Sequence, residues 1–388
     1  MTLPIEARLA IESALSERFG GSVQLATDAQ SFPHSRVFRC TLQSSPATMP
    51  RTIIVRLPRA GDVRGGRTGL RREQAALEYL TTLGSEIAPR YLAGDDAAGF
   101  LASDDLGEPP SLLDVLLSDD WQAARQAFLS FARGLGRLHA QTLRKPGDVL
   151  PPFLTITPVP VREHWQQVQA AVLQQGLPAP SGVDADIDLA HRLLSEPGAP
   201  LALSSGDISV VNCKISGDTA RIFDFEDACF RHPFVDAVVL RYPYPTGGPP
   251  WRLPHEITLA GETAYRAELA RSWPPGANDG HYEHGMAAAC AAWTILRLAR
   301  LPKVNTGPDR DSWMLLPSGW TAPPPNRSRR RQLVAILETC IAFARRADGF
   351  KALTTWCERL TGTLRERWPE AHEALPIYPA FSNNAAAD

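Results

Sequence analysis

The sequence contains very little lysine. Only four of its 40 basic residues are lysines (Lys145, Lys214, Lys303 and Lys351), so arginine supplies the other 36. No lysine occurs in the first 144 of the 388 residues, which excludes any mechanism that requires a lysine amine in that part of the chain.

Long apolar runs and paired cysteines are also missing. The longest uncharged apolar stretch of the C-terminal half, residues 286–296, is too short to span a bilayer, and the amphipathic, acid-containing N-terminal segment predicts a first helix rather than a signal peptide. The six cysteines are scattered, with no C-x-x-C pair and no histidine cluster at zinc spacing, which argues against a disulfide framework or a structural zinc site. We therefore expect a soluble cytoplasmic protein without a membrane partner.

The charge balance argues against nucleic acid as a partner. The chain has 40 basic and 42 acidic residues, a formal net charge of -2, and an isoelectric point of about 6.5. Such a chain has no general positive field to attract a phosphate backbone. Its length suggests two or three packed units and is sufficient for a large hydrophobic core.

Hydrophobic periodicity divides the chain into two parts. Alternation predicts strands over 37–42 and 52–57, and a helical pattern over 70–83 ends at Gly84. Beyond residue 105 the pattern is mainly helical. The predicted helices are 121–143, 257–272, 281–301, 329–347 and 350–367, and the proline-rich connectors are 146–160, 243–254 and 317–325. We expect an α+β protein with a small β-rich lobe over 1–104 and a large helical lobe over 105–388.

One segment combines polar residues that could carry chemistry. An apolar run leads into Gly206-Asp207, Asn212 follows five positions later, and two short β-like runs flank the turn-forming sequence of residues 216–218. In such a hairpin, paired residue numbers sum to about 435 or 436. Asn212 and Asp224 should therefore lie opposite each other, within one residue of register.

This arrangement suits a metal and a proton acceptor. An amide oxygen and a carboxylate are hard ligands of the kind that Mg²⁺ prefers, and Asn212 and Asp224 supply them. Asp207, on the loop before the hairpin, would then be close enough to accept the proton of a substrate hydroxyl group. Glu226 and Asp227 are either further ligands or solvated and capping residues.

The segment resembles the catalytic region of the aminoglycoside phosphotransferase and choline kinase families, which are relatives of protein kinases. Their pattern is H-G-D-x-x-x-x-N, then D-[WF]-E about a dozen residues later and a D-P-x-x-D-type ending, matched here by Gly206-Asp207, Asn212, Asp224-Phe-Glu226 and Asp236. The resemblance implies a bilobal protein-kinase-like fold, bound ATP or GTP with Mg²⁺, and a catalytic loop over 201–236. Asp236 would anchor that loop by hydrogen bonds.

A strand and a helix of the first lobe extend the resemblance. Along 53–57, Ile54 and Arg56 share one strand face, in the register of the kinase V-A-I-K strand. The resemblance then implies that Ile54 lies under adenine and that Arg56 takes the place of the phosphate-binding lysine. Glu73 lies on the apolar face of the following helix and needs a cationic partner, for which Arg56 is the candidate, unless Glu73 reaches solvent.

Other matches are local. Residues 100–107 resemble the hinge that contacts adenine through backbone groups, although Asp104 and Asp105 could equally be exposed loop acids. The loop over 28–39 would cover the phosphates but contains no glycine, so Ser35 and Arg36 are its candidate donors. His139 lies in a segment like the family's L-x-x-L-H-A helix and is expected to be structural.

Three other functions compete with this hypothesis. Residues 61–68 fit a P-loop except that Arg67 replaces lysine, and Asp224 could then serve as its second motif, although a solvated connector explains the segment with less effort. A glycosidase could pair Asp207 with Asp224, but the hairpin and Asn212 would be unexplained. No G-x-S-x-G elbow supports a serine hydrolase.

We therefore expect an ATP-dependent O-phosphotransferase that acts on a hydroxyl group of a small molecule such as an antibiotic, sugar or nucleoside. The alternative is a pseudokinase or nucleotide-binding module, which Arg56, Ser205 (in place of the family's histidine) and the glycine-free loop favour. Residues 251–375 contain 17 basic and 13 acidic residues, which argues against a polycationic aminoglycoside as the acceptor. The arginine-rich run 327–331 is either a solvated helix start or a patch that binds phosphate or carboxylate.

Overall fold

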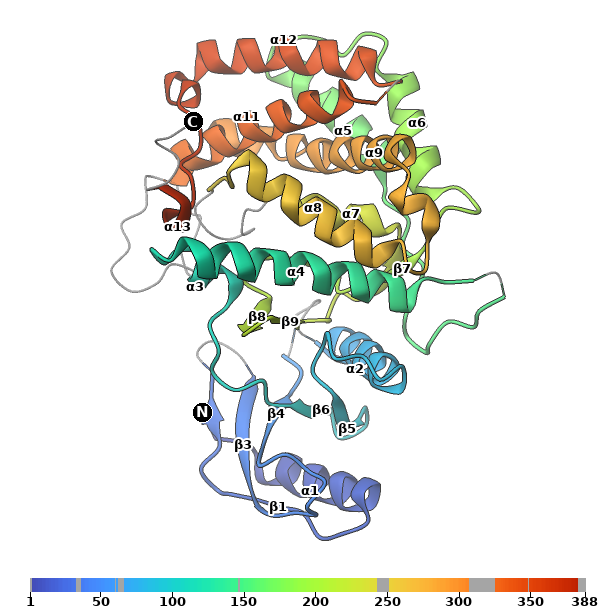
Figure 1. Cartoon of the computed structure of the whole chain (residues 1–388), viewed down its shortest axis with the longest axis vertical. Helices are drawn as coiled ribbons and strands as arrows, with labels where there is room; N and C mark the ends of the chain where they lie inside the picture. The colour runs from blue at the N-terminus through green and yellow to red at the C-terminus, as the bar shows by residue number, and fades with distance from the viewer. Residues whose placement is uncertain are drawn as a thin grey trace.

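The computed structural model shows two lobes, one above the other, with the helical lobe the larger (Figure 1). It describes residues 2–32, 36–59, 61, 66–145, 147–242, 251–306, 325–347 and 349–382. The predicted connectors at 243–254 and 317–325 fall largely outside these residues. Pro325 itself begins a helix, because proline is tolerated in a first helical turn.

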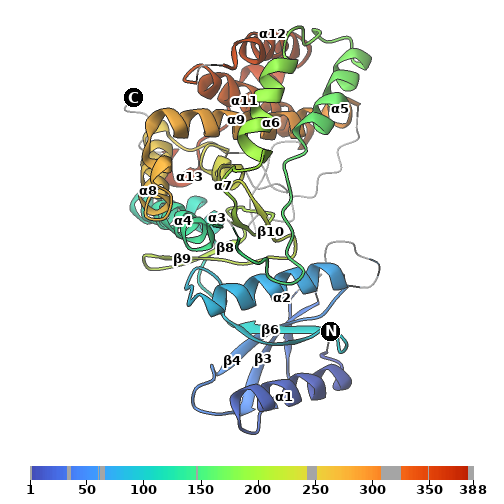
Figure 2. The ribbon, with the colours of Figure 1, turned by 90° about the vertical axis from the view of Figure 1, so that its right-hand side faces the viewer.

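The small lobe is an antiparallel sheet with a helix on each face (Figure 2). Its strand order is β1-β3-β4-β6-β5, and β2 also pairs with β3. The elements are α1 (Ile5–Phe19), β1 (Gln24–Leu25), β2 (Gln30–Ser31), β3 (Val37–Ser44), β4 (Thr52–Arg56), α2 (Arg67–Thr82), β5 (Tyr91–Asp95) and β6 (Phe100–Asp104). The predicted strands and helix of this lobe are thus present, with ends shifted by one to three residues.

The side chains of strand β4 alternate between the two faces of this sheet. Ile53 and Val55 are fully buried with the apolar residues of α1 and β3, whereas Ile54 and Arg56 point to the opposite face, toward the large lobe. This follows from the alternation of side chains along a strand. The face predicted for Arg56 is confirmed.

The large lobe is mostly helical. Its helices are α3 (Leu112–Leu116), α4 (Trp121–Thr142), α5 (Val161–Gln174), α6 (Asp184–Ser195), α7 (Pro233–Ala237), α8 (His255–Leu269), α9 (Asp279–Leu298), α10 (Leu301–Thr306), α11 (Pro325–Ala344), α12 (Lys351–Arg367) and α13 (Pro379–Ser382), with short 3₁₀ turns at Val238–Leu240, Pro274–Ala277 and Pro369–His372. Its strands are β7 (Ala202–Ser204), β8 (Cys213–Ser216), β9 (Thr219–Ile222) and β10 (Cys229–Arg231). Helices α5 and α6 lack a counterpart among the predicted elements.

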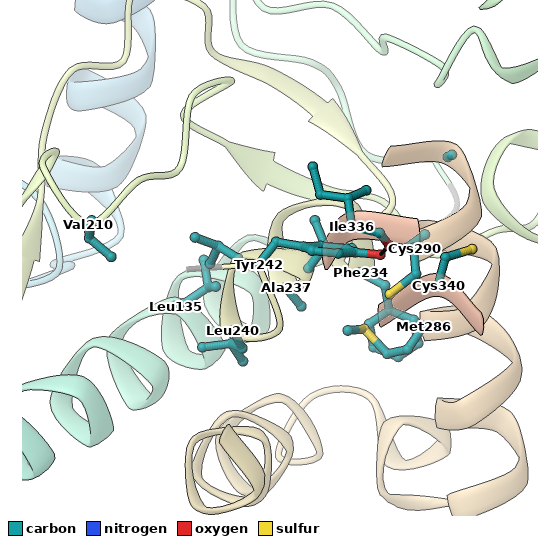
Figure 3. Packing of buried hydrophobic residues seen from close by; sticks show 14 of the residues in the cluster. Leu135, Val210, Phe234, Ala237, Leu240, Tyr242, Met286, Cys290, Ile336 and Cys340 are labelled. Atoms are coloured by element: carbon teal, nitrogen blue, oxygen red, sulfur yellow. Dashed lines mark hydrogen bonds between the residues drawn. The ribbon is translucent and has the colours of Figure 1, made fainter. Parts of the chain in front are cut away.

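The core of this lobe lies where α7 meets α9 and α11 (Figure 3). Phe234, Met286 and Cys290 are fully buried there. The hydroxyl group of Tyr242 donates a hydrogen bond to the carbonyl oxygen of Ile336, 3.3 Å away, so the polar tip of this buried ring is satisfied. This packing fixes α7, which contains the last residues of the predicted catalytic segment.

The β8–β9 hairpin lies between the lobes and contacts both. Cys213 pairs with Ile222, so paired residue numbers sum to 435, as the hairpin hypothesis required. The amide of Ile222 donates to the carbonyl of Ile87 (2.7 Å), and the amide of Ile215 donates to Pro110 (2.9 Å). The hairpin is therefore held by the small lobe on one side and by the connection between the lobes on the other.

Two expectations from what the sequence lacks can be compared with the fold. In the described part of the chain, no helix is long and apolar enough to cross a membrane. All six cysteines are buried and none forms a disulfide.

Helix α7 begins with a buried histidine. The Nδ1 atom of His232 accepts a hydrogen bond from the backbone amide of Phe234 (3.2 Å) and so caps the helix. Only 3% of His232 is exposed. Burial, with smaller contributions from the charges of His281 and His139, lowers the pKa of His232 to about 3.

The buried histidine predicts a loss of stability in mild acid. Below about pH 6.5 the unfolded chain binds a proton at His232 that the folded chain does not, so the free energy of unfolding falls by about 1.4 kcal/mol per pH unit. His232→Asn keeps a capping oxygen but removes this titration. In urea unfolding at pH 7 and pH 5, wild type should lose about 2 kcal/mol more than the variant. His255→Asn, at an exposed site, should behave like wild type; an unchanged pH dependence in His232→Asn would contradict a neutral buried ring.

Candidate active site

A cavity of about 660 Å³ lies between the two lobes. Strands β3 and β4 form one wall, and α2, the chain after β6 and the chain after β9 form the others. Its walls include Arg36, Arg39, Ile54, Arg56, Glu73, Ser103, Asp104, Asp105, Leu106, Lys214, Phe223, Asp224 and Glu226.

A single arginine on β4 joins three carboxylates at one end of the cavity. The Nη1 atom of Arg56 lies 2.5 Å from Glu73 Oε2 on α2 and 3.3 Å from Asp224 Oδ1, and Nη2 contacts Glu226. The predicted ion pair between Arg56 and Glu73 is therefore present. Glu226, whose role the sequence left open, completes the cluster from the large lobe.

This cluster carries an excess of negative charge. Three carboxylates surround one guanidinium group, so two negative charges are not compensated within it. Burial raises the pKa of Glu73 above its ordinary value, opposed by the charge of Arg56 and assisted by that of Asp224. Burial also acts to lower the pKa of Arg56, but the charges of Glu73 and Asp224 outweigh it and hold that pKa above its ordinary value. A divalent cation would relieve the repulsion.

The two candidate metal ligands, Asn212 and Asp224, come from adjoining segments of the chain. The backbone amide of Phe223 donates to the carbonyl of Asn212 (3.0 Å), which places Asn212 beside the start of the Asp224 segment. The side-chain amide of Asn212 donates to the carbonyl of Asp207 (3.1 Å), so its Nδ2 is used and its oxygen points elsewhere. No group of three or more histidine, cysteine or carboxylate side chains forms a metal site among the described residues. Two hard oxygen donors match Mg²⁺, which takes few protein ligands and shares the rest with phosphates and water.

Asp224 adopts an unusual backbone conformation. Its φ of +67° lies in the left-handed region, which costs a non-glycine residue about 1 kcal/mol or more. The contacts of Arg56 with Asp224 and Glu226 and the pairing of Asn212 with Phe223 hold the segment on both sides. Such strain is typical of residues whose side chain must point in one direction.

The loop that carries Asp207 is packed tightly against the Asp224 segment. Gly206 has φ +85°, and a Cβ atom there would lie 2.2 Å from the carbonyl oxygen of Asp227. Only glycine fits both the conformation and the space. This contact fixes the spacing between the loop of Asp207 and the chain that follows Asp224.

A buried network anchors the same loop. Asp236 accepts hydrogen bonds from Ser204 (2.9 Å) and from Arg231 Nε (3.0 Å), and lies 3.3 Å from Nε2 of His139. Burial acts to raise the pKa of Asp236, but the charge of Arg231 and these hydrogen bonds hold it below its ordinary value. Asp236 is thus bonded to the loop through Ser204, as the sequence suggested, and His139 is a buried structural residue with partners on both ring nitrogens.

Arg231 also contacts the loop beside Ser205, the position at which the sequence departs from the family pattern. Ser205 is fully buried, and its hydroxyl group has no hydrogen-bond partner within the described residues. The Nη2 atom of Arg231 lies 3.5 Å from the carbonyl oxygen of Gly206, next to it. The loop is thus held by Arg231 and Ser204, without a contribution from the side chain at position 205.

The chain after β6 is tied across the cavity to β3. Arg39 contacts Asp105 through Nε (2.8 Å), Glu108 through Nη1 (2.6 Å) and the carbonyl of Gly107 through Nη2 (2.9 Å). The Asp105 side chain is only 4% exposed, so it is not a free loop acid. The backbone amide of Asp104 donates a hydrogen bond to the carbonyl oxygen of Arg90 (2.9 Å), and Asp104 lines the cavity next to Asp105.

The structure brings most of the predicted site residues together, but not all of them. Asp207 and Asn212 are not among the residues that line the described cavity. Arg36 lines the cavity, whereas Ser35 lies outside the described residues.

Sequence reasoning missed Arg39 and Lys214 as wall residues. Each lies between two buried residues of its strand and therefore faces the opposite side. This alternation is the only feature of the sequence that could have indicated their position. The P-loop alternative is wrong, because Asp224 follows the antiparallel β8–β9 hairpin rather than a parallel strand.

The protein combines a curled antiparallel sheet with a helical lobe, and the cavity between them is large enough for a nucleotide. Arg56 pairs with Glu73 at this cavity, and Asn212 and Asp224 flank the β8–β9 hairpin. These features define a small-molecule kinase of the protein-kinase-like class. The model of the phosphotransferase enzyme family matches residues 35–273, and the chain belongs to this family. Comparison with curated proteins gives no match.

A solved structure shares this fold. A protein from Ralstonia eutropha assigned to the aminoglycoside phosphotransferases is 12% identical, with a TM-score of 0.55 over 88% of this chain and 99% of that one. Choline kinase from Cryptosporidium parvum is also 12% identical, with a TM-score of 0.48 over 87% of this chain and 93% of that one.

The packing at Gly206 predicts a position-specific effect of a single methyl group. Gly206→Ala should displace the Asp227 segment, lower the melting temperature by several degrees and abolish catalysis, because the added Cβ meets a backbone oxygen. Gly217→Ala is a matched control: its φ is also positive (+56°), but nothing lies within 4 Å. It should cost only about 1 kcal/mol and retain activity. Equal losses in the two variants would show that backbone conformation, not space, decides the effect.

Proposed function

We propose that this chain transfers the γ-phosphoryl group of ATP to a hydroxyl group of a small molecule. The observation that supports this most directly is the Arg56 cluster, in which one cation and three carboxylates lie at the end of a cavity large enough for a nucleotide. Uncompensated carboxylates repel a bare triphosphate, so nucleotide binding should depend on a divalent cation.

The nucleotide would lie along the cavity. Ile54, Asp104 and Asp105 line the cavity. Ile54 would lie under the base, and the backbone of Asp104 and Asp105 would border its other edge. Arg56, held by Glu73, would neutralise charge on the phosphates, with Arg36 near them. Asn212 and Asp224 would hold Mg²⁺, which when bound supplies charge compensation on the phosphate oxygens.

Asp207 is the proposed general base. Its carboxylate accepts the proton of the acceptor hydroxyl group while that oxygen attacks the γ-phosphorus and the bond to the β,γ-bridging oxygen breaks, which releases ADP. Gly206 and Asn212 hold the loop from both sides of Asp207, so its position relative to Asp224 is fixed before substrate binds. Positioning and charge stabilisation therefore supply most of the rate enhancement.

A pseudokinase is the second candidate. Arg56 in place of lysine and Ser205 in place of histidine favour it. Against it, Arg56 makes the expected pair with Glu73, and Arg231 supports the loop beside Ser205. These contacts compensate for both departures and favour catalysis.

Asp207→Asn tests the proposed base. With ATP, Mg²⁺ and a library of hydroxyl compounds, the variant should lose about 100-fold or more in acceptor-dependent ADP release, with unchanged affinity for the non-hydrolysable analogue AMP-PNP. Asp218→Asn, at the exposed hairpin turn, is the control and should retain activity. Full turnover by Asp207→Asn would remove the assigned base, and absence of Mg²⁺-dependent AMP-PNP binding in wild type would reject the proposed function.

Arg56→Lys tests whether the site is built around arginine. Arg56 uses two nitrogens to reach three carboxylates on both lobes, which a single ammonium group cannot reproduce. The variant should lose about tenfold or more in kcat/KM for ATP. Arg71→Lys, at a half-exposed pair with Asp96, should leave it unchanged. A gain of activity in Arg56→Lys would mark arginine as a handicap in this site.

A further inference from the structure

A second cavity, of about 610 Å³, lies next to the cavity that is proposed to hold the nucleotide. The two are called here the second and the first cavity. Four residues line both of them: Asp104, Asp105, Leu106 and Lys214. The second cavity alone is lined by Thr48, Met49, Pro50, Arg90, Pro109, Ser216, Thr219 and Arg221. The chain after β6 and one strand of the β8–β9 hairpin are therefore a shared wall.

The hairpin turns a polar face toward the second cavity. It lies between α4 and the small lobe (Figure 1), and every second residue of β8 and β9 is buried. Because side chains alternate along a strand, the remaining residues share the opposite face. All four of them line the second cavity: Lys214, Ser216, Thr219 and Arg221. Strand alternation thus produces a continuous polar wall from two short segments.

Two cations lie directly opposite each other on this polar face. Lys214 on β8 is the register partner of Arg221 on β9. Like charges in directly opposite positions of antiparallel strands destabilise the pairing. Both residues are half-buried, and neither side chain makes a hydrogen bond or ion pair with another of the described residues. Two positive charges therefore face the second cavity without compensation from that part of the chain.

The carboxylates nearby are engaged with other residues. Asp104 Oδ1 lies 3.4 Å from Nη2 of Arg90, and Asp105 lies 2.8 Å from Nε of Arg39. The carboxylate of the hairpin turn, Asp218, contacts α4 and does not line the second cavity. Each acidic residue of the cavity wall thus has an arginine of its own, which leaves Lys214 and Arg221 unmatched.

Backbone contacts prevent the hairpin from relieving this repulsion by bending. Ser111, in the connection between the lobes, forms an antiparallel bridge with Lys214, and the amide of Ile215 donates to the carbonyl of Pro110 (2.9 Å). On the other strand, the amide of Ile222, next to Arg221, donates to the small lobe. The two cations are therefore held in place before any ligand binds, which lowers the entropic cost of binding one.

The rest of the wall indicates the size and polarity of a ligand. Met49, Pro50, Leu106 and Pro109 supply apolar surface, and Ser216 and Thr219 add hydroxyl groups beside the two cations. Cavities that bind small molecules typically combine an apolar lining with a few polar groups in fixed positions. A small organic molecule with one anionic end matches both kinds of wall.

We propose that the second cavity binds a small organic anion whose phosphate or carboxylate group lies between Lys214 and Arg221. Such a group replaces the repulsion between the two cations by charge-assisted hydrogen bonds with both. Because Lys214 and residues 104–106 also line the first cavity, the bound anion opposes the binding of a nucleotide, which is itself anionic. This effect on nucleotide binding rests on the proposed function, whereas the anion site does not.

Inorganic phosphate and malonate test the site without turnover. Arg221 lines the second cavity but not the first, so Arg221→Gln distinguishes the two. In calorimetry without metal or nucleotide, at least one of these dianions should bind wild type about tenfold more tightly than Arg221→Gln. The preferred dianion identifies the ligand as a phosphate or a carboxylate. Arg192→Gln removes an exposed arginine from α6 and should bind like wild type.

Two outcomes of this titration would overturn the proposal. One is the absence of binding of both dianions to wild type. The other is equal affinity in wild type and Arg221→Gln, which would mean that the anion binds elsewhere, for example among the arginines of the first cavity.

Stability measurements separate loss of the site from misfolding. Without an added dianion, Arg221→Gln should melt at the same or a higher temperature than wild type, because the substitution removes the repulsion with Lys214. Arg221→Lys keeps the charge and should retain part of the affinity for the dianion. Loss of binding in both variants together with a lowered melting temperature would show that Arg221 is structural and would overturn the proposal.

The link to the first cavity is measured through AMP-PNP. At constant free Mg²⁺, a saturating concentration of the preferred dianion should weaken AMP-PNP binding to wild type about fivefold. In Arg221→Gln the same concentration should change the affinity for AMP-PNP little. An equal loss of affinity in both proteins would show direct competition in the first cavity and would reject the link.

The anion site and the proposed function can fail independently in these experiments. Anion binding that depends on Arg221, without any Mg²⁺-dependent binding of AMP-PNP, would support the site and reject the proposed function. Nucleotide binding and phosphoryl transfer without an Arg221-dependent anion site would reject the site and leave the proposed function supported.

Discussion

The cluster around Arg56 is the interaction on which the arrangement of the two lobes depends. One guanidinium group on β4 reaches Glu73 in the small lobe and Asp224 and Glu226 in the large lobe. A planar group with several donors can join carboxylates that approach from different directions, whereas an ammonium group acts as a compact point charge. The negative charge that remains uncompensated lies at the point where this contact joins the two lobes.

The sequence predicted what depends on local periodicity. Alternation along β4 was sufficient to place Ile54 and Arg56 on one face, helical spacing placed Glu73 opposite them, and the turn composition gave the hairpin register. Contacts between distant segments could not be predicted in this way. Arg39 and Asp105 are 66 positions apart in the sequence, yet Arg39 Nε lies 2.8 Å from an Asp105 carboxylate oxygen. The residues around each of them give no indication of this contact, which depends on the course of the chain after β6.

Departures from the family's pattern are compensated at other positions. Ser205 leaves a buried hydroxyl group unsatisfied among the described residues, and Arg231 supports the adjacent carbonyl while it neutralises Asp236. A single position read in isolation therefore indicates a weaker site than the assembled neighbourhood provides.

The presence of Lys214 in the cavity wall has a consequence for chemical labelling. Lys214 comes from β8 of the large lobe, and it is the only lysine among the described residues that line the cavity. A lysine amine can attack an electrophile carried by a nucleotide analogue, whereas the guanidinium group of Arg56 stays protonated and offers no such amine. Covalent labelling of this enzyme by such reagents would therefore report on the large-lobe wall, and the pattern of acylated peptides would differ from that of kinases with a strand lysine.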